Sequence, residues 1–311
     1  MKVLITCPPM LKSIDEFRSS FEAKNIELVC PPVVQTLTEQ ELIALVPEMD
    51  GWIIGDDPAT ATVFAAGKKG KLKAAVKWGV GVDNVDFKAA GALGIPISNT
   101  PEMFGEEVSD IALAYLLALS RHTHQIDRKV RAGIWYKPPG ISLPGRKAAL
   151  IGFGNIGKAT AYKLKSFGLK VSIYDPFKVA TEEEKNNYLF DSLENVVSKA
   201  QFLIVACALT KENRHLVNED IIGKLNFGAY LMNVSRGPLV KEAALVKALE
   251  SGHVAGAGLD VFEDEPLVKN NPLLKFDSVI FGSHNGSNTI DAVRRASLKA
   301  IEILFTYLNK N

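Results

Sequence analysis

Short apolar runs alternate with longer helical patterns along the first hundred residues. The runs lie at residues 3–6, 27–30, 52–54, 74–78 and 96–98. They are nearly continuous in apolar side chains, which is typical of strands buried on both faces of a parallel sheet. Helical patterns separate them, and Thr38 with Glu41 three residues later forms a capping box at the start of one. The first part of the chain is therefore predicted to be a βα domain.

A second series of the same kind begins near Lys147. Its strands are predicted at residues 148–151, 170–174, 202–206, 229–234, 255–261 and 278–281. Gly168 and Gly252 stand where glycines end helices. The pattern predicts an α/β protein with two doubly wound parallel-sheet domains. We expect the first at residues 1–98, completed by a C-terminal helix within 289–311, and the second at residues 99–288.

A long helix is predicted between the two series. Thr100 fits its N-cap and Pro101 its first turn, and the helix continues to about Ser120. Residues 111–119 are apolar all round, so we expect this helix to be buried on every side. A subunit interface is the preferred explanation, and burial between domains is the alternative.

Composition excludes several classes of protein. The 36 Lys and Arg residues nearly balance 35 Asp and Glu residues, which gives no reason to expect a nucleic acid or an acidic membrane as partner. The cysteines, Cys7, Cys30 and Cys207, have no metal-ligand spacing, so we expect neither a disulfide scaffold nor a metal. The longest apolar run is too short to span a bilayer, and we expect no signal peptide at the N-terminus. A cytoplasmic protein is expected.

A glycine-rich motif follows the first strand of the second series. Gly152, Gly154 and Gly157 have the GxGxxG spacing, and the next predicted strand ends at Asp175. In a dinucleotide site the glycines allow a tight turn, close approach of a diphosphate and close helix packing, while the acidic residue accepts hydrogen bonds from a ribose. The motif predicts NAD binding; Lys178 lies close enough to keep NADP as an alternative.

Three later segments place polar residues at predicted strand ends, at 233–237, 260–266 and 283–286. They supply Arg236, Glu265 and His284. Arg can hold a carboxylate and polarise a carbonyl, His can transfer a proton, and a carboxylate can orient that His. Each residue alone also fits a surface role, but together, after a cofactor motif, they favour oxidation of a 2-hydroxy acid.

These motifs, with 79–84 and 99–101, resemble the D-isomer-specific 2-hydroxyacid dehydrogenase family over nearly the whole chain. The resemblance implies that His284 is the acid/base, Glu265 its support and Arg236 the substrate anchor. It implies a flavodoxin-like substrate domain, a Rossmann-like NAD domain, a cleft between them that closes on the substrate, and a homodimer. It also implies a cofactor site that is lined by Gly152, Gly154, Asn155, Ile156, Gly157, Asp175, Cys207, Val234, Ser235, Asp260 and Gly286. Cys207 is expected to be a pocket wall rather than a nucleophile.

The substrate contacts are expected in the first domain. By resemblance, the backbone of Val80 and Gly81 would hold a carboxylate, with Asn84 nearby. Around residues 75–86 the chain is most similar to the D-3-phosphoglycerate dehydrogenase branch, in which Lys77 would be a basic phosphate contact. Asp56 and Asp57 would repel such a phosphate.

The expected function is hydride transfer between NAD and C2 of a small D-2-hydroxy acid or 2-oxo acid. Oxidation of phosphoglycerate is the alternative within the enzyme class. A non-enzymatic NAD-sensing partner protein is the alternative outside that class.

Overall fold

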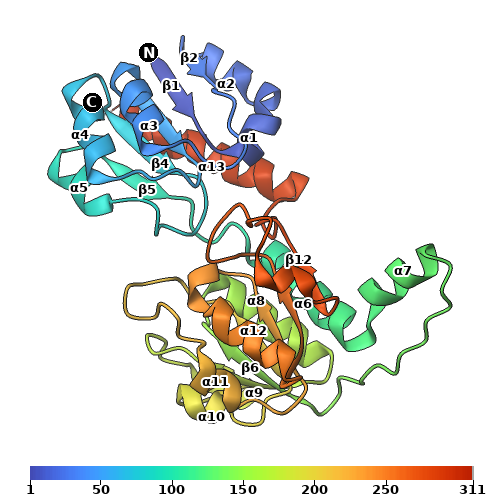
Figure 1. Cartoon of the computed structure of the whole chain (residues 1–311). Coiled ribbons are helices and arrows are strands. Elements are labelled where there is room, and N and C mark those ends of the chain that lie inside the picture. The colour runs from blue at the N-terminus through green and yellow to red at the C-terminus, as the bar shows by residue number, and fades with distance from the viewer. Residues whose placement is uncertain (310–311) are drawn as a thin grey trace. The chain divides into compact units, whose positions relative to one another are not determined.

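The computed structural model describes residues 1–309, which form two compact units (Figure 1). The first is Met1–Met103 with the chain from Asn288 onward, and the second is Phe104–Ser287. The expected boundary lay at 98/99, five residues earlier. The structure differs because Asn99 still pairs with Lys77 in the first sheet, and the Thr100 hydroxyl accepts a hydrogen bond from the Gly79 amide at 2.8 Å. Residues 310–311, the expected end of the last helix, lie outside the described residues.

The first unit contains five parallel strands in the order β2-β1-β3-β4-β5, which is the flavodoxin-like order. The strands are β1 (Lys2–Ile5), β2 (Glu27–Val29), β3 (Gly51–Ile54), β4 (Ala74–Lys77) and β5 (Ile97–Asn99). The helices are α1 (Pro8–Lys12), α2 (Arg18–Glu22), α3 (Glu39–Leu45), α4 (Ala61–Lys69), α5 (Phe87–Ala92) and α13 (Ile290–Leu308), with short 3-10 turns η1 (Ile14–Glu16) and η2 (Val46–Glu48). Helix α13 packs on β3 and β4, and the Trp78 indole donates a hydrogen bond to the Ser297 hydroxyl at 3.1 Å.

The second unit contains seven parallel strands in the order β12-β11-β10-β9-β6-β7-β8. The strands are β6 (Lys147–Ile151), β7 (Lys170–Tyr174), β8 (Leu189–Phe190), β9 (Phe202–Val205), β10 (Ala229–Asn233), β11 (Val254–Leu259) and β12 (Val279–Phe281). The helices are α6 (Gly105–Arg121), α7 (Thr123–Arg131), α8 (Asn155–Ser166), α9 (Glu182–Asn187), α10 (Leu193–Val197), α11 (Glu219–Gly223) and α12 (Glu242–Glu250), with 3-10 turns η3 (Gly237–Leu239) and η4 (Pro272–Lys275). The strand order reverses direction between β6 and β9, where open α/β sheets bind their ligands.

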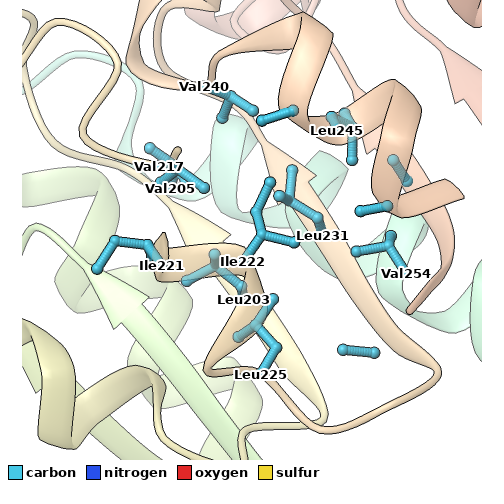
Figure 2. Packing of buried hydrophobic residues seen from close by; sticks show 14 of the residues in the cluster. Leu203, Val205, Val217, Ile221, Ile222, Leu225, Leu231, Val240, Leu245 and Val254 are labelled. Carbon is cyan, nitrogen blue, oxygen red and sulfur yellow. The ribbon is translucent and has the colours of Figure 1, made fainter. Parts of the chain in front are cut away.

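Both faces of the second sheet are covered. On one face, aliphatic side chains of β9, β10 and β11 pack against α11 and α12, as Leu203, Leu231 and Leu245 show in Figure 2. On the other face α6 lies on β10 and β11, where Gly258 faces the ring of Tyr115. Burial of the central strands β6, β9, β10 and β11 on both sides explains why the sequence shows continuous apolar runs there.

The long helix starts later than predicted. It begins at Gly105 rather than after Thr100, because the Thr100 hydroxyl is engaged with Gly79 and does not cap the helix. Within one chain Ala114 is exposed and Leu113 and Leu117 are partly exposed, so burial on every side and the subunit interface that would explain it stay predictions. None of the helices within residues 1–309 combines the length and apolar character that crossing a membrane requires.

Candidate active site

The glycine-rich loop joins β6 to α8 at the point where the strand order reverses. Gly152 has φ of 95°, and a Cβ there would lie 2.6 Å from the backbone of Cys207. A Cβ on Gly157 would lie 2.1 Å from the carbonyl oxygen of Gly152, so this glycine lets α8 pack on the loop. Around Gly154, in contrast, no atom lies within 4 Å of a built Cβ. Two glycines are needed by the fold, and the third leaves open space where a diphosphate fits at the helix N-terminus.

Asp175 follows β7 beside this loop. Its carboxylate accepts hydrogen bonds from the amides of Phe153 at 2.8 Å and Phe177 at 3.0 Å. Lys178, the residue that kept NADP as an alternative, lies 3.1 Å from the Glu184 carboxylate. Backbone and lysine contacts lower the pKa of Glu184 to about 2, so it remains charged and compensates Lys178. The loop therefore fits NAD, with Asp175 placed for a ribose.

The neighbouring wall comes from β9 and β10. Cys207 follows β9 and packs against Gly152; burial raises the pKa of its thiol to about 11. A neutral thiol is a poor nucleophile, as expected for a pocket wall. Ser235 follows β10 and its hydroxyl donates to the Cys207 carbonyl, while the Val234 amide donates to Val205 at 3.3 Å.

The remaining predicted cofactor residues lie at the start of α8. Asn155 opens the helix, and its side chain lies against Gly105 of α6, where a Cβ would be 2.5 Å from its amide oxygen. The Ile156 carbonyl accepts a hydrogen bond from the Thr160 hydroxyl at 2.8 Å. Asn155 therefore joins α6 to the cofactor loop.

The structure brings His284 and Glu265 together. His284 Nδ1 lies 2.7 Å from Glu265 Oε2, and their side chains are 25% and 22% exposed. The other carboxylate oxygen of Glu265 accepts the amide of Phe262 at 2.9 Å, which fixes the acid on its own turn. The contact to Glu265 holds the imidazole ring in one orientation through its Nδ1 atom.

Asp260 anchors the segment that carries His284. Its carboxylate is buried and accepts the amides of Asn285 at 3.1 Å and Gly286 at 2.8 Å, while its carbonyl accepts the His284 amide at 2.7 Å. His284 has φ of 54°, a conformation that these bonds hold in place. Asp260 is thus a buried carboxylate that positions the turn after β12.

Tyr115 is a positioning residue that sequence reasoning missed. Its hydroxyl donates to Asp260 Oδ1 at 3.3 Å, and burial raises the pKa of the phenol, which therefore stays a neutral donor. Gly258 and Gly282 make room for it, since a Cβ on either would lie 2.5 Å from a Tyr115 atom. The only sequence signal was a helix that is apolar all round, which indicated packing and not a contact to Asp260.

Arg236 follows β10, which pairs with β11, the strand before Glu265. Its guanidinium donates to the Ser235 carbonyl at 2.8 Å, and its own carbonyl accepts the Asn233 side chain at 2.9 Å. Gly237 touches the next loop so closely that a Cβ would lie 1.8 Å from the Phe262 carbonyl. The loops of Arg236 and Glu265 are therefore in direct contact.

Sequence reasoning also missed a second set of contacts that holds the Glu265 loop. Glu263 accepts from the amide of Glu242 at 2.7 Å, its own amide donates to Glu242 Oε1 at 2.7 Å, and His215 Nε2 lies 3.1 Å from its carboxylate. These residues are far apart in sequence and form no motif. They tie the loop to the N-terminus of α12.

The predicted substrate residues lie at the carboxyl end of the first sheet. Among the described residues, the amides of Val80 and Gly81 donate no hydrogen bond, and Gly79 before them has φ of 121°. Asn84 donates to the carbonyls of Gly55 at 3.1 Å and Asp57 at 2.7 Å. We name Val80 and Gly81 the carboxylate cradle, since adjacent backbone amides of this kind bind anions.

Lys77 is directed inward. Its side chain is 3% exposed, and its ammonium donates to the Gly55 carbonyl at 2.6 Å and the Asp56 carboxylate at 3.0 Å. Across residues 1–309, no group of three or more His, Cys, Asp or Glu side chains could hold a metal ion. The first unit therefore has backbone groups suited to binding an anion, and the second unit has an acid/base pair and a dinucleotide loop.

Comparison with known proteins shows which family the chain resembles. Residues 113–286 match the family model described as D-isomer specific 2-hydroxyacid dehydrogenase, NAD binding domain. The chain is 38% identical to a glyoxylate reductase of Thermofilum pendens, over 76% of this chain and 72% of that protein. It is 34% identical to a hydroxypyruvate reductase of Thermotoga maritima, over 88% and 89%. The crystal structure of the TT0316 protein of Thermus thermophilus superposes with a TM-score of 0.87 at 31% identity, over 100% of this chain and 98% of that one.

Proposed function

The chain belongs to the D-isomer specific 2-hydroxyacid dehydrogenase family, and we propose that it reduces small 2-oxo acids through His284, Glu265 and Arg236. It is an NAD-dependent oxidoreductase that transfers hydride between the nicotinamide and C2 of a D-2-hydroxy acid or 2-oxo acid. The 2.7 Å contact between His284 and Glu265, on a loop that touches the Arg236 loop, carries the assignment of these residues.

We infer that the substrate is a short 2-oxo acid such as glyoxylate or hydroxypyruvate. The relatives described above carry those substrates in their names. Phosphoglycerate has less support, because the Lys77 ammonium that would hold its phosphate already contacts the Asp56 carboxylate at 3.0 Å. A fixed acid/base pair in the same unit as a cofactor loop also favours an enzyme over a protein that only senses NAD.

In this proposal, a guanidinium and backbone amides orient the substrate. In the second unit the Arg236 guanidinium is the group proposed to bind a carboxylate and polarise a carbonyl, and in the first unit the amides of the carboxylate cradle are the proposed anion donors. Hydrogen-bond donors that are already oriented stabilise the negative charge that develops on the carbonyl oxygen.

The proton comes from His284. Its Nε2 donates to the carbonyl oxygen of the 2-oxo acid and takes that proton back in the reverse reaction, while Glu265 holds Nδ1 and stabilises the imidazolium. NADH held by the glycine-rich loop would supply the hydride to C2. Asp260 and Tyr115 keep the His284 turn in place throughout.

The test is replacement of His284 by Gln. We expect NADH oxidation with glyoxylate or hydroxypyruvate to fall by about 10²–10⁴-fold, the usual contribution of general acid catalysis. NADH affinity, followed by fluorescence titration, should stay within about twofold. His253→Gln is the matched control, because that histidine contacts the Ile222 carbonyl far along the sheet. Turnover in His284→Gln equal to that of the control would refute the role.

We also propose a homodimer formed by the second unit. Its support is the partly exposed apolar face of α6 and the segment after α7, where Ile134 is 51% and Trp135 82% exposed. Figure 1 shows α7 and this segment projecting from the body of the second unit. Trp135→Glu should convert dimer to monomer in sedimentation velocity, and a monomeric wild type would refute the proposal.

We also propose a cytoplasmic location. The cytoplasm holds a pool of NADH, and the three cysteines are free thiols, as a reducing compartment would keep them.

A further inference from the structure

We propose that Asp56 is a specificity-determining residue: by pairing with buried Lys77 beside the carboxylate cradle, it makes the site reject a C3 phosphate and accept a C3 hydrogen or hydroxyl. The inference rests on the proposed function and concerns the class of substrate that the same site takes. It follows from where the two charges lie in the first unit.

Lys77 is a buried cation whose charge is balanced inside the protein. Its ammonium donates to the Gly55 carbonyl at 2.6 Å and to Asp56 Oδ1 at 3.0 Å, and only 3% of its side chain is exposed. An ammonium in such surroundings needs a compensating charge. Asp56 supplies that charge, so Lys77 is not a free cation for a substrate phosphate.

The pair lies directly beside the cradle. A Cβ built on Gly79 would lie 3.8 Å from the Lys77 ammonium, and Gly79 immediately precedes Val80. The Gly55 carbonyl that accepts from Lys77 also accepts from the Asn84 amide at 3.1 Å. C3 of a 2-oxo acid is only two bonds from the carboxylate carbon. Its substituent therefore comes within range of the Asp56 charge when the carboxylate occupies the cradle.

The sign of that charge decides the preference. The Asp56 side chain is 39% exposed whereas Lys77 is covered, so an approaching group meets the carboxylate before the ammonium. Asp57 turns inward, where it accepts the amides of Leu37 at 2.8 Å and Gly55 at 3.2 Å. A phosphate dianion is repelled by Asp56 in a partly desolvated site, while a hydroxyl meets a hydrogen-bond acceptor.

Three proteins test the pair: wild type, Asp56→Asn, and the double variant Asp56→Asn with Lys77→Gln. The quantity is kcat/KM for phosphohydroxypyruvate divided by kcat/KM for hydroxypyruvate. Asp56→Asn removes the anion and frees the ammonium, so the ratio should rise at least tenfold. The double variant removes both charges, so it should lose the part of the gain that the freed ammonium supplies and keep the part that comes from relief of repulsion by Asp56. Glu48→Gln, from an exposed pair with Lys71 at 3.2 Å near the start of β3, should leave the ratio within threefold of wild type.

A second measurement uses only the wild type, because an unpaired buried ammonium can prevent folding. The inhibition constants of 3-phosphoglycerate and glycerate are compared from low to high salt. Screening weakens repulsion, so the phosphoglycerate/glycerate ratio of inhibition constants should fall as salt rises. A ratio that rises with salt means that the phosphate is attracted, and overturns the inference.

The remaining outcomes are also decisive. An Asp56→Asn ratio within threefold of wild type, a similar gain in Glu48→Gln, or a double variant with the full gain of Asp56→Asn would each overturn the role of the pair. Failure of wild-type protein to reduce any 2-oxo acid would instead remove the proposed function. Reduction of hydroxypyruvate without the predicted change in ratio leaves that function standing and removes only this inference.

Discussion

Different glycines of the glycine-rich loop serve cofactor binding and folding, and alanine substitutions can distinguish the two roles. Gly154 has φ of −74° and ψ of −160°, which alanine adopts without strain, and its Cβ would enter open space. The methyl group would occupy the volume expected for the diphosphate. Loss of one hydrogen bond to a charged group costs about 1.5–3 kcal/mol, which weakens NADH binding about 10- to 150-fold. The melting temperature of Gly154→Ala should change by no more than about 2 °C.

Gly152→Ala is the matched contrast. Its φ of 95° costs an L residue about 1–2 kcal/mol, and the overlap with the Cys207 backbone at 2.6 Å adds about 1–3 kcal/mol. A loss of about 2–5 kcal/mol should lower the melting temperature by about 4–20 °C. Fluorescence titration with NADH and differential scanning calorimetry measure the two effects. Wild-type NADH affinity in Gly154→Ala would refute the assignment of the open space to the diphosphate.

Three further predictions concern single side chains. Glu265→Gln should lower kcat about 10- to 150-fold, from loss of a charge-assisted hydrogen bond, with NADH affinity unchanged by fluorescence titration; equal kcat would contradict the support given to His284. Cys207 should resist iodoacetamide at pH 7.5 and react only as pH approaches its pKa of about 11, as peptide mapping by mass spectrometry measures, and rapid alkylation at pH 7.5 would contradict this. The pKa of Glu184 is lowered to about 2, so its stabilisation is complete above its ordinary pKa of 4.5 and is lost as pH falls toward 2; Glu184→Gln should flatten this dependence in acid unfolding followed by circular dichroism.

The strands were predictable because burial on both faces leaves a simple pattern. Each predicted strand is found within two residues of its expected bounds. A short, nearly continuous apolar run between helical patterns is typical of a strand that is buried on both faces. β8, the two-residue edge strand Leu189–Phe190, and α7, which has no buried residue, lacked any such pattern. The start of α6 was wrong for another reason, since the Thr100 hydroxyl bonds to Gly79, a contact that no local pattern reveals.

The candidate site was predictable to the extent that it follows strand ends. Arg236, Glu265 and His284 each come after a strand, and the structure places β10, β11 and β12 side by side. The partners that hold them were not predictable. Tyr115 reaches Asp260 across 145 positions of sequence, and His215 reaches Glu263 across 48. Such contacts depend on which helix covers which strand.

These buried partners explain how exposed side chains can be held for catalysis. Asp260 and Asn233 are almost fully buried. Their side chains form hydrogen bonds with the backbone of the turns that carry His284 and Arg236. Gly237 then presses one turn against the next, where even a methyl group would not fit. Reactive side chains can stay partly exposed because the order comes from the backbone beneath them. Substitutions at the buried partners should therefore lower kcat without removing any group that touches the substrate.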